Sequence, residues 1–357
     1  MKRHINIPVF IPHEGCPNNC VFCNQHSITQ TSEKADRDIR PEIEKALSGI
    51  ADKDGSEVEI AFFGGSFTGI DRAVMTRLLR DAYEYIKRGE VASIRLSTRP
   101  DFIDEEILGI LSEYGVRHIE LGIQSMSDSV LAASRRGHTA EISERACELV
   151  VKHGFSLTGQ MMVGLPGSSV ADELYTAERI CEMGADSARI YPCVVFYDTP
   201  LCDMAREGMY TPITDREGAD RAAECIKVFD RYGVTLLRVG LQSGEGLSPE
   251  KVYAGASHSA VGERAFSKVY LDKLLPLTEN AAASVPDAEK TAVYDLVILC
   301  GIGETSTVAG QKRENKEKAA ECVRVHGIKL RHVKIKECAD IEKLHAVRVY
   351  LEKIKCK

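Results

Sequence analysis

The sequence has no run of about 18 uncharged apolar residues, the length at which a membrane-spanning helix becomes credible. Its opening residues, Met1 to Ile7, hold no separate apolar stretch followed by a small-residue cleavage site, so we expect no secretory signal. It also lacks an internal repeat and a heptad array. These absences favour a cytoplasmic protein with no membrane partner.

Twelve cysteines are present among the 357 residues, but nine of them are scattered and lack the tight spacing of a ligand set. In a reducing compartment such cysteines are most simply small buried hydrophobic residues. Cys193, Cys202 and Cys300 are the candidates for a second iron-sulfur cluster, and the sequence leaves that question open.

The other three cysteines, Cys16, Cys20 and Cys23, form a C-x3-C-x2-C run directly after the apolar segment 5–12. Three thiolates on so short a loop can bind three irons of a cubane 4Fe-4S cluster and leave the fourth iron open for reaction. A structural zinc site is the alternative, with His13 or His26 as the fourth ligand.

Strand-like apolar segments alternate with helical patterns along most of the chain, which predicts a parallel sheet with right-handed crossovers. The turn Gly64-Gly65-Ser66 is not G-x-G-x-x-G, and this disfavours a dinucleotide-binding sheet. We therefore predict an α/β fold, a partial (β/α)6-type TIM barrel whose site lies on the loops at the carboxyl ends of its strands. The predicted strands are 5–12, 57–63, 94–97, 118–123, 156–163, 187–191 and 235–239.

The barrel is predicted to span residues 1–240. Residues 241–290 are rich in Gly, Ser, Ala and Pro and are predicted to be irregular or a linker, although the second half of 255–270 has a helical pattern. Residues 291–357 are predicted to form a small basic module resembling a βαβ unit, with strands at 296–299 and 328–335 on either side of a charged helix.

The formal net charge of -7 is unevenly distributed along the chain. Residues 311–336 contain nine Lys or Arg and three Glu, a local net charge of +6. One interpretation is a solvated helix face of mixed charge. The other is a surface near the barrel mouth that holds RNA phosphates.

The cysteine loop, with Phe22 as the aromatic residue before Cys23, resembles the cluster loop of the radical S-adenosylmethionine (radical SAM) superfamily. The longer segment 7–25 resembles the radical SAM domain of the Elongator catalytic-subunit family and, more distantly, oxygen-independent coproporphyrinogen oxidase. This resemblance implies a 4Fe-4S cluster on Cys16, Cys20 and Cys23, and SAM bound at the open iron. It also implies an electron donor such as ferredoxin or flavodoxin, reductive cleavage of SAM, and a 5'-deoxyadenosyl radical that abstracts hydrogen from a substrate.

The same resemblance assigns the polar groups of SAM to particular strand ends. Gly64, Gly65 and Ser66 match the turn that contacts the ammonium group, with Ser where the superfamily has Glu. Arg136 matches an arginine that pairs with the SAM carboxylate, which suits a guanidinium fork.

Ribose and adenine contacts follow in the same way. Gln124, Gln160 and Ser97 match ribose contacts, but the relative has Asp at the position of Gln160 and Glu at that of Ser97. The candidates for the adenine site are Phe22, Met162, Val163 and Tyr191.

The substrate is not fixed by these motifs. The Elongator catalytic subunit combines its radical SAM domain with an acetyltransferase domain and modifies the wobble uridine of tRNA, but the tail of this chain shows no counterpart of that second domain. Both RNA and a small molecule therefore stay open as substrates, and a zinc-stabilised binding protein is the non-catalytic alternative.

Overall fold

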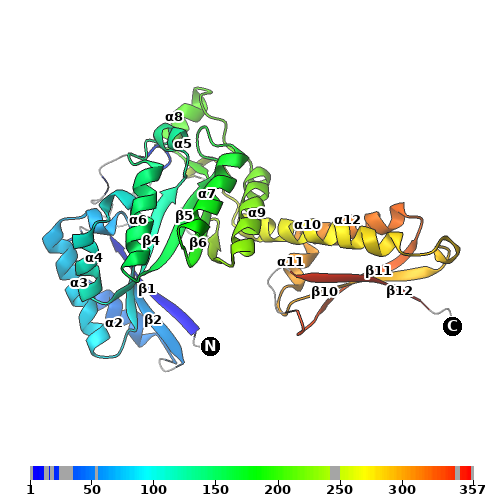
Figure 1. Ribbon diagram of the computed structural model, residues 1–357, viewed down its shortest axis with the longest axis horizontal. Coiled ribbons are helices and arrows are strands. Elements are labelled where there is room, and N and C mark those ends of the chain that lie inside the picture. Colours follow the sequence, from blue (N-terminus) through cyan, green and yellow to red (C-terminus); the bar gives the residue numbers. More distant parts are fainter. Residues whose placement is uncertain are drawn as a thin grey trace.

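The computed structural model describes residues 3–11, 16, 20–23, 35–52, 55–241, 250–341 and 346–354. A half-open barrel forms one end of the molecule, and an elongated C-terminal module extends from its side (Figure 1). Two hydrophobic cores of different size lie in these two parts and are joined by a long helix.

The barrel wall is a seven-stranded parallel sheet whose spatial order follows the chain. The partial TIM barrel predicted from the sequence is therefore confirmed, because every crossover returns to the neighbouring strand. The strands are β1 (Arg3–Ile11), β2 (Ser56–Gly64), β3 (Ser93–Thr98), β4 (Val116–Gln124), β5 (Ser156–Val163), β6 (Ser187–Pro192) and β8 (Thr235–Val239).

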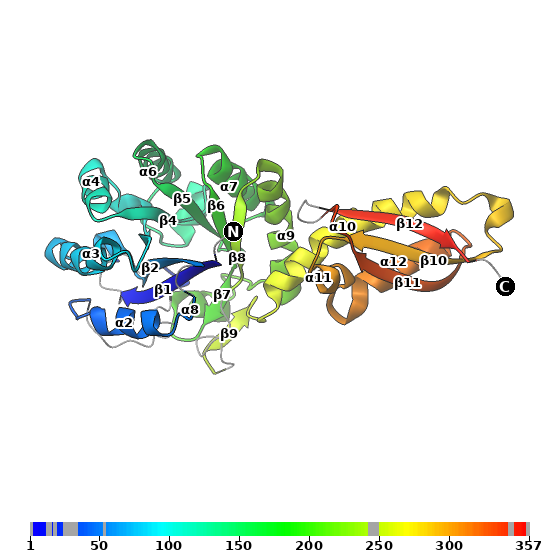
Figure 2. The same cartoon turned by 90° about the horizontal axis from the view of Figure 1, so that it is seen from below.

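Helices form an arc around the outside of this sheet, as the view from below shows (Figure 2). Two of them begin with complete capping boxes, Ser169 with Asp172 and Thr214 with Glu217, which satisfy the first backbone N-H groups. The outer helices are α2 (Arg40–Ser48), α3 (Arg72–Lys87), α4 (Glu105–Glu113), α6 (Ala140–Lys152), α7 (Val170–Glu182) and α9 (Asp215–Tyr232).

Short elements follow the carboxyl ends of the strands. They are the 3-10 turns η2 (Phe67–Gly69) and η3 (Pro100–Phe102), the helices α5 (Asp128–Ala133) and α8 (Pro200–Arg206), and the antiparallel pair β7 (Val194–Phe196) and β9 (Val252–Gly255).

Alternation along the strands separates an apolar face from a polar one. Ile60 and Leu121 pack in the core between the sheet and the helices. Their neighbours Glu59 and Glu120 point to the other side, where Glu59 meets Arg95 and Glu120 meets Arg189. The concave inner face of the half-barrel is therefore lined with charged and polar groups.

The helical pattern in the second half of 255–270 is confirmed, because it forms the start of the helix α10 (Val261–Ala283), but the expectation of an irregular segment is wrong for residues 271–283, which continue that helix. Ala265 and Val269 of this helix belong to the barrel core, whereas Leu274 and Ala282 belong to the core of the module. Because the two halves of α10 pack against different partners, its apolar residues follow no single stripe that a periodic pattern would reveal.

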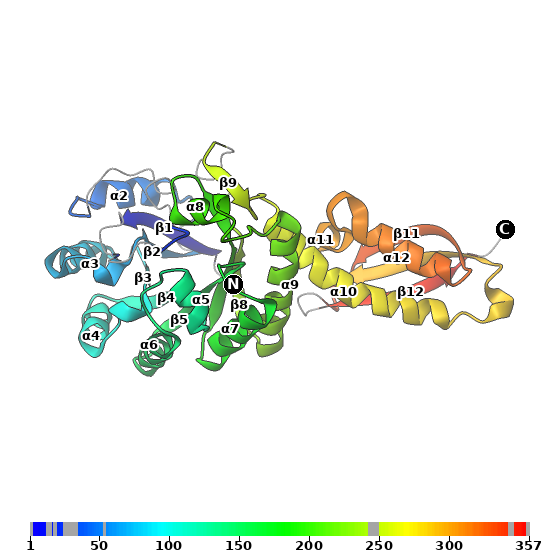
Figure 3. The ribbon, with the colours of Figure 1, turned by 90° about the horizontal axis from the view of Figure 1, so that it is seen from above.

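The C-terminal module contains the predicted βαβ unit and one strand that was not predicted. In its sheet β10 lies between β11, which is parallel to it, and β12, which is antiparallel. Helices α10 and α12 lie on one face of this sheet (Figure 3). The elements are η5 (Asp287–Glu289), β10 (Val293–Cys300), α11 (Thr305–Ala309), η6 (Gln311–Arg313), α12 (Glu314–Val325), β11 (Lys329–Glu337) and β12 (Val347–Lys353).

Among the residues that the structure describes, no helix combines the length and the apolar character needed to cross a bilayer. The predicted domain boundaries at 240 and 290 stay a prediction.

Candidate active site

The described part of the cysteine loop is fastened to the mouth of the barrel by backbone hydrogen bonds. The Cys23 N-H donates to the Cys20 carbonyl at 3.0 Å, which closes a turn, and the Val21 N-H donates to Ser134 at the end of α5 at 3.1 Å. The Val21 carbonyl accepts from the Leu201 N-H of α8 at 2.9 Å. Two other segments, the end of α5 and the start of α8, thus hold this loop at the carboxyl ends of the strands.

Two buried arginines face the loop thiols. Arg136 Nη1 lies 3.4 Å from Cys20 Sγ, and Arg99 Nη1 lies 4.0 Å from the same sulfur. Arg99 is held in turn by the Arg136 carbonyl at 2.7 Å and by the carboxylate of Asp101 at 2.8 and 2.9 Å. The sequence assigned no role to Arg99 or Asp101, although Arg99 belongs to the polar turn that ends the third predicted strand, where the site was expected.

The Cys16 thiol lies in the same environment. Burial raises its pKa, while the Ser66 backbone N-H and the guanidinium groups of Arg99 and Arg136 act in the opposite direction. Three thiolates bring negative charge to one loop, and these two cations and one N-H donor are suited to stabilise it. The donor set and its electrostatic surroundings therefore fit an anionic iron-sulfur cluster.

The glycine turn after β2 lies directly against the end of β1. Gly64 has φ +115°, and a Cβ atom added there would come within 2.2 Å of the Ile11 carbonyl oxygen, so only glycine fits. The Gly65 N-H donates to the same carbonyl at 3.2 Å. Ser66 is buried, and its hydroxyl lies 2.8 Å from Thr98 Oγ1 and accepts from the Arg99 N-H at 3.2 Å.

At the end of β4, buried polar atoms without partners gather beside the arginine. Arg136 Nη2 donates to the Gly122 carbonyl at 2.6 Å, but among the described residues its Nε has no partner. Gln124 has a positive φ of 68°, is buried, and likewise has no described partner for its Oε1. A buried donor and acceptor left unpaired are the groups expected where a polar ligand binds.

His138 is a further buried group at this place that sequence reasoning did not assign. Its Nδ1 lies 3.8 Å from the Asp101 carboxylate, and neither ring nitrogen has a hydrogen-bond partner within the described chain. Burial, aided by the Arg136 charge, lowers the pKa of His138 to about 3. The imidazole is therefore neutral near pH 7 and can accept as well as donate.

The three remaining polar candidates lie on the inner face of the sheet. Ser97 of β3 is paired in register with Glu120 of β4, and Gln160 of β5 is paired in register with Arg189 of β6. Tyr191 lies beside Arg189, and burial raises the pKa of its phenol.

Two of the apolar candidates come together and one does not. Phe22 and Met162 pack against the same small core at the mouth, which includes Val21 and Leu165. Val163 instead points into the core between the sheet and the helices. Its side chain is therefore directed away from the inner face, and only its backbone stays a candidate for an adenine contact.

Among the described residues, no three His, Cys, Asp or Glu side chains converge closely enough for one metal ion, and this includes the three loop cysteines as they are placed here. His13 and His26, the proposed fourth zinc ligands, lie outside the described residues. Cys193 and Cys202 lie in the core at the mouth and Cys300 in that of the module, so these three cannot share a second cluster.

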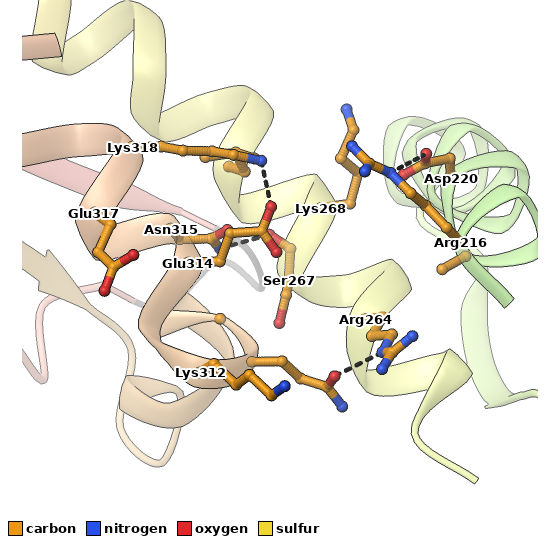
Figure 4. A pocket seen from close by; sticks show the side chains of 14 residues that line it. Arg216, Asp220, Arg264, Ser267, Lys268, Lys312, Glu314, Asn315, Glu317 and Lys318 are labelled. Atoms are coloured by element: carbon orange, nitrogen blue, oxygen red, sulfur yellow. Dashed lines mark hydrogen bonds and ion pairs between the residues drawn. The ribbon is translucent and has the colours of Figure 1, made fainter. Parts of the chain in front are cut away.

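A charged groove lies between the barrel and the module, with a volume of about 480 Å³ (Figure 4). Arg216 comes from the first turn of α9, Arg264 from α10, and Lys312 from the turn before α12. Helices α9 and α10 both begin at the carboxyl ends of the strands, because they follow β6 and the β7–β9 pair. The groove therefore lies at the same end of the barrel as the cysteine loop. Its other charged residues are Asp220, Lys268, Glu314, Glu317 and Lys318.

Comparisons with known proteins agree with this geometry. The profile of the radical SAM superfamily matches residues 10–180, and that of the Radical_SAM C-terminal domain matches residues 185–270. An uncharacterised protein of Methanocaldococcus jannaschii is 28% identical over 229 residues, which cover 60% of this chain and 69% of that protein. The tRNA uridine(34) acetyltransferase of the same organism is 26% identical over 185 residues, which cover 46% of this chain and 34% of that enzyme.

Among solved structures, the Elp3 protein of Methanocaldococcus infernus, lacking its N-terminus, has a TM-score of 0.59 at 17% sequence identity. The match covers 81% of this chain and 70% of that one, and at this identity it shows a shared fold. This chain spans only about a third of the length of the acetyltransferase that it matches.

Proposed function

Since this chain belongs to the radical SAM superfamily, we propose that Cys16, Cys20 and Cys23 hold a 4Fe-4S cluster and that the residues around them bind SAM. The family is one of enzymes that use such a cluster and SAM. Bound there, the cluster and SAM would supply reductive cleavage chemistry that yields methionine and 5'-deoxyadenosine, with the hydrogen atom coming from the substrate.

The observation that carries the proposal is the position of Arg136. This one guanidinium reaches Cys20 Sγ and the carbonyl at the end of β4, and its Nε has no described partner. It therefore lies between the proposed cluster and the proposed SAM carboxylate. Gln124, the Gly64-Gly65 turn and Ser66 lie on the neighbouring strand ends, where the remaining groups of SAM would need them.

Replacement of each loop cysteine tests this proposal. Cys16→Ala, Cys20→Ala or Cys23→Ala should abolish both the brown colour after anaerobic reconstitution and the release of 5'-deoxyadenosine, because no described cysteine can take the place of the lost ligand. Cys322→Ala, which removes a partly exposed thiol from α12, should change neither. Full iron content in any one loop variant would contradict the proposal, and a colourless protein with one zinc per chain would support the structural zinc site.

The favoured substrate is RNA, reached partly through the basic segment 311–336. Lys312 and Lys318 of this segment line the groove between the barrel and the module together with Arg216 (Figure 4). Lys312 and Arg313 are consecutive non-glycine residues with positive φ, a strained arrangement that is more often found at binding sites than elsewhere. The curated relative that is a tRNA uridine(34) acetyltransferase supports the same class of substrate.

A small molecule enclosed by the half-barrel is the second candidate substrate. It is favoured by the charged inner face, where Glu120 and Arg189 pair at 2.9 Å below the strand ends. Either substrate requires an external electron donor such as ferredoxin or flavodoxin. The cluster needs a donor of low reduction potential, and this requirement also suits the reducing cytoplasm.

A further inference from the structure

The sheet of the C-terminal module has one covered face and one open face. Tyr294, Leu296 and Ile298 of β10 belong to the module core beneath α10 and α12. Residues Asp295, Val297 and Leu299 alternate with them and therefore point to the other side. Seen from below, the sheet lies in front of both helices (Figure 2).

The strand register places the residues of the open face in cross-strand rows. One row consists of Lys334 on β11, Val297 on β10 and Tyr350 on β12. The next row consists of Lys336, Leu299 and Arg348. In the first row Val297, which is fully buried, lies between Lys334 and the exposed ring of Tyr350, and in the second row Leu299 lies between Lys336 and Arg348.

Charge on this face is balanced at one end and unbalanced at the other. The buried carboxylate of Asp295 accepts from Arg331 at 2.8 and 3.0 Å and lies 2.6 Å from Lys334 Nζ, which is also 3.7 Å from Glu352. Among the described residues, no carboxylate forms an ion pair with Lys336 or Arg348. Both are exposed, so the row beside Tyr350 keeps a net positive charge.

We propose that this open face, around Tyr350, Lys336 and Arg348, binds a single-stranded segment of RNA. Tyr350 is 43% exposed in the middle of β12, so one face of its ring is free to stack on a base. Lys336 and Arg348 lie within one row of it and contact the backbone phosphates on either side. Aromatic side chains on an open sheet are suited to unpaired bases, because a base within a duplex has no free face to stack.

The proposal deepens the proposed function, because it takes the same class of partner, but it concerns a different surface from the groove. It can be tested with the full-length protein and a fluorescein-labelled 12-nucleotide oligouridine, without iron or SAM. A failure of SAM cleavage and a failure of RNA binding are therefore separate results.

Fluorescence anisotropy at low salt should show binding by the wild-type protein. Tyr350→Ala should weaken the affinity by about five- to a hundred-fold, the range found for the loss of one stacked base, while Tyr350→Phe should stay within about twofold. The double variant Lys336→Ala, Arg348→Ala should reduce the slope of log K against log salt by about 1.4, or about 0.7 for each lost phosphate contact. Tyr175→Ala is the matched control, since that tyrosine is similarly exposed but lies on α7, outside the barrel.

Three results would overturn the proposal. They are no binding of the oligouridine, equal binding by Tyr350→Ala and wild type, or a stronger preference for duplex RNA than for the single strand. A fourth such result would come from analytical sedimentation. If the wild-type protein is a dimer and Tyr350→Ala is a monomer, the face binds a second copy of the chain and not RNA.

Discussion

Replacing Arg136 by Ala should weaken SAM binding while the cluster still assembles. The guanidinium is charged at any accessible pH and already oriented, with Nη2 2.6 Å from the Gly122 carbonyl and Nη1 3.4 Å from Cys20 Sγ. A hydrogen bond to a charged group contributes about 1.5–3 kcal/mol. The loss corresponds to about a ten- to a hundred-fold lower affinity, and we expect the upper half of that range because little side-chain entropy is lost on binding.

The neighbouring arginine provides the matched control. Arg135 is exposed and has a positive φ of 50°, so Arg135→Ala removes the same charge one residue away without touching the buried site. Arg136→Lys keeps the charge but removes the fork, and we expect it to recover only part of the affinity. Together these variants separate a specific pairing with the SAM carboxylate from a general effect of positive charge.

The assay is equilibrium dialysis of SAM against protein reconstituted anaerobically, with iron and sulfide measured on the same sample. Unchanged SAM affinity at full iron content would refute the assignment of Arg136 to the carboxylate. A loss of iron from this variant would instead show that the main role of Arg136 is to support the cluster at Cys20. Because Arg136→Ala also leaves the buried Gly122 carbonyl unpaired, thermal unfolding should be followed in parallel.

Two further predictions concern the module and the groove. The triple variant Arg216→Ala, Lys312→Ala, Lys318→Ala should lower the salt dependence of RNA binding by up to about 2 in log-log slope, whereas Lys45→Ala, Lys87→Ala, Arg88→Ala on the outer helices should leave it unchanged. Hydrogen bonds from Arg331 hold the pKa of Asp295 well below its usual value, so its stabilising contribution is present above about pH 4 and is lost as the pH falls further. Asp295→Asn should therefore flatten the acid side of the thermal stability profile, and the exposed Asp340→Asn should not; an unchanged acid profile in Asp295→Asn would contradict this role.

The barrel could be predicted from the sequence because each strand buries one apolar face against a helix, which leaves alternation in the residues themselves. The strand at 235–239 was predicted from its place in the alternation of strands and helices, and it forms β8. Most of helix α10 could not be found in this way, because its two halves are buried by different cores and Pro276 lies within it. Strand β12 was missed although Val347, Val349 and Leu351 pack on the core and alternate with polar residues, the pattern of a half-buried strand.

The candidate site was predictable where a residue type is tied to one chemical task. Three closely spaced cysteines and a Gly-Gly turn satisfy that condition, and the structure places Gly64 against the end of β1, where no side chain fits. The sequence assigned no role to Arg99, Asp101 and His138, because arginine, aspartate and histidine in the turns after strands or helices are common on protein surfaces. Only the fold shows that these three are gathered around Cys20 and Arg136.

The connection between the barrel and the module constrains how a substrate can reach the site. After β6 the chain passes through β7 and α8 at the mouth, runs down the outside of the barrel in α9, returns to the mouth through β8, and enters α10 after β9. Helix α10 has 23 residues, which correspond to about 35 Å of helix, and it is buried in both cores. A helix anchored at both ends holds the module at a fixed position relative to the cysteine loop. The groove and the open sheet face are therefore at set distances from the site, so an RNA that contacts both would be presented in one orientation.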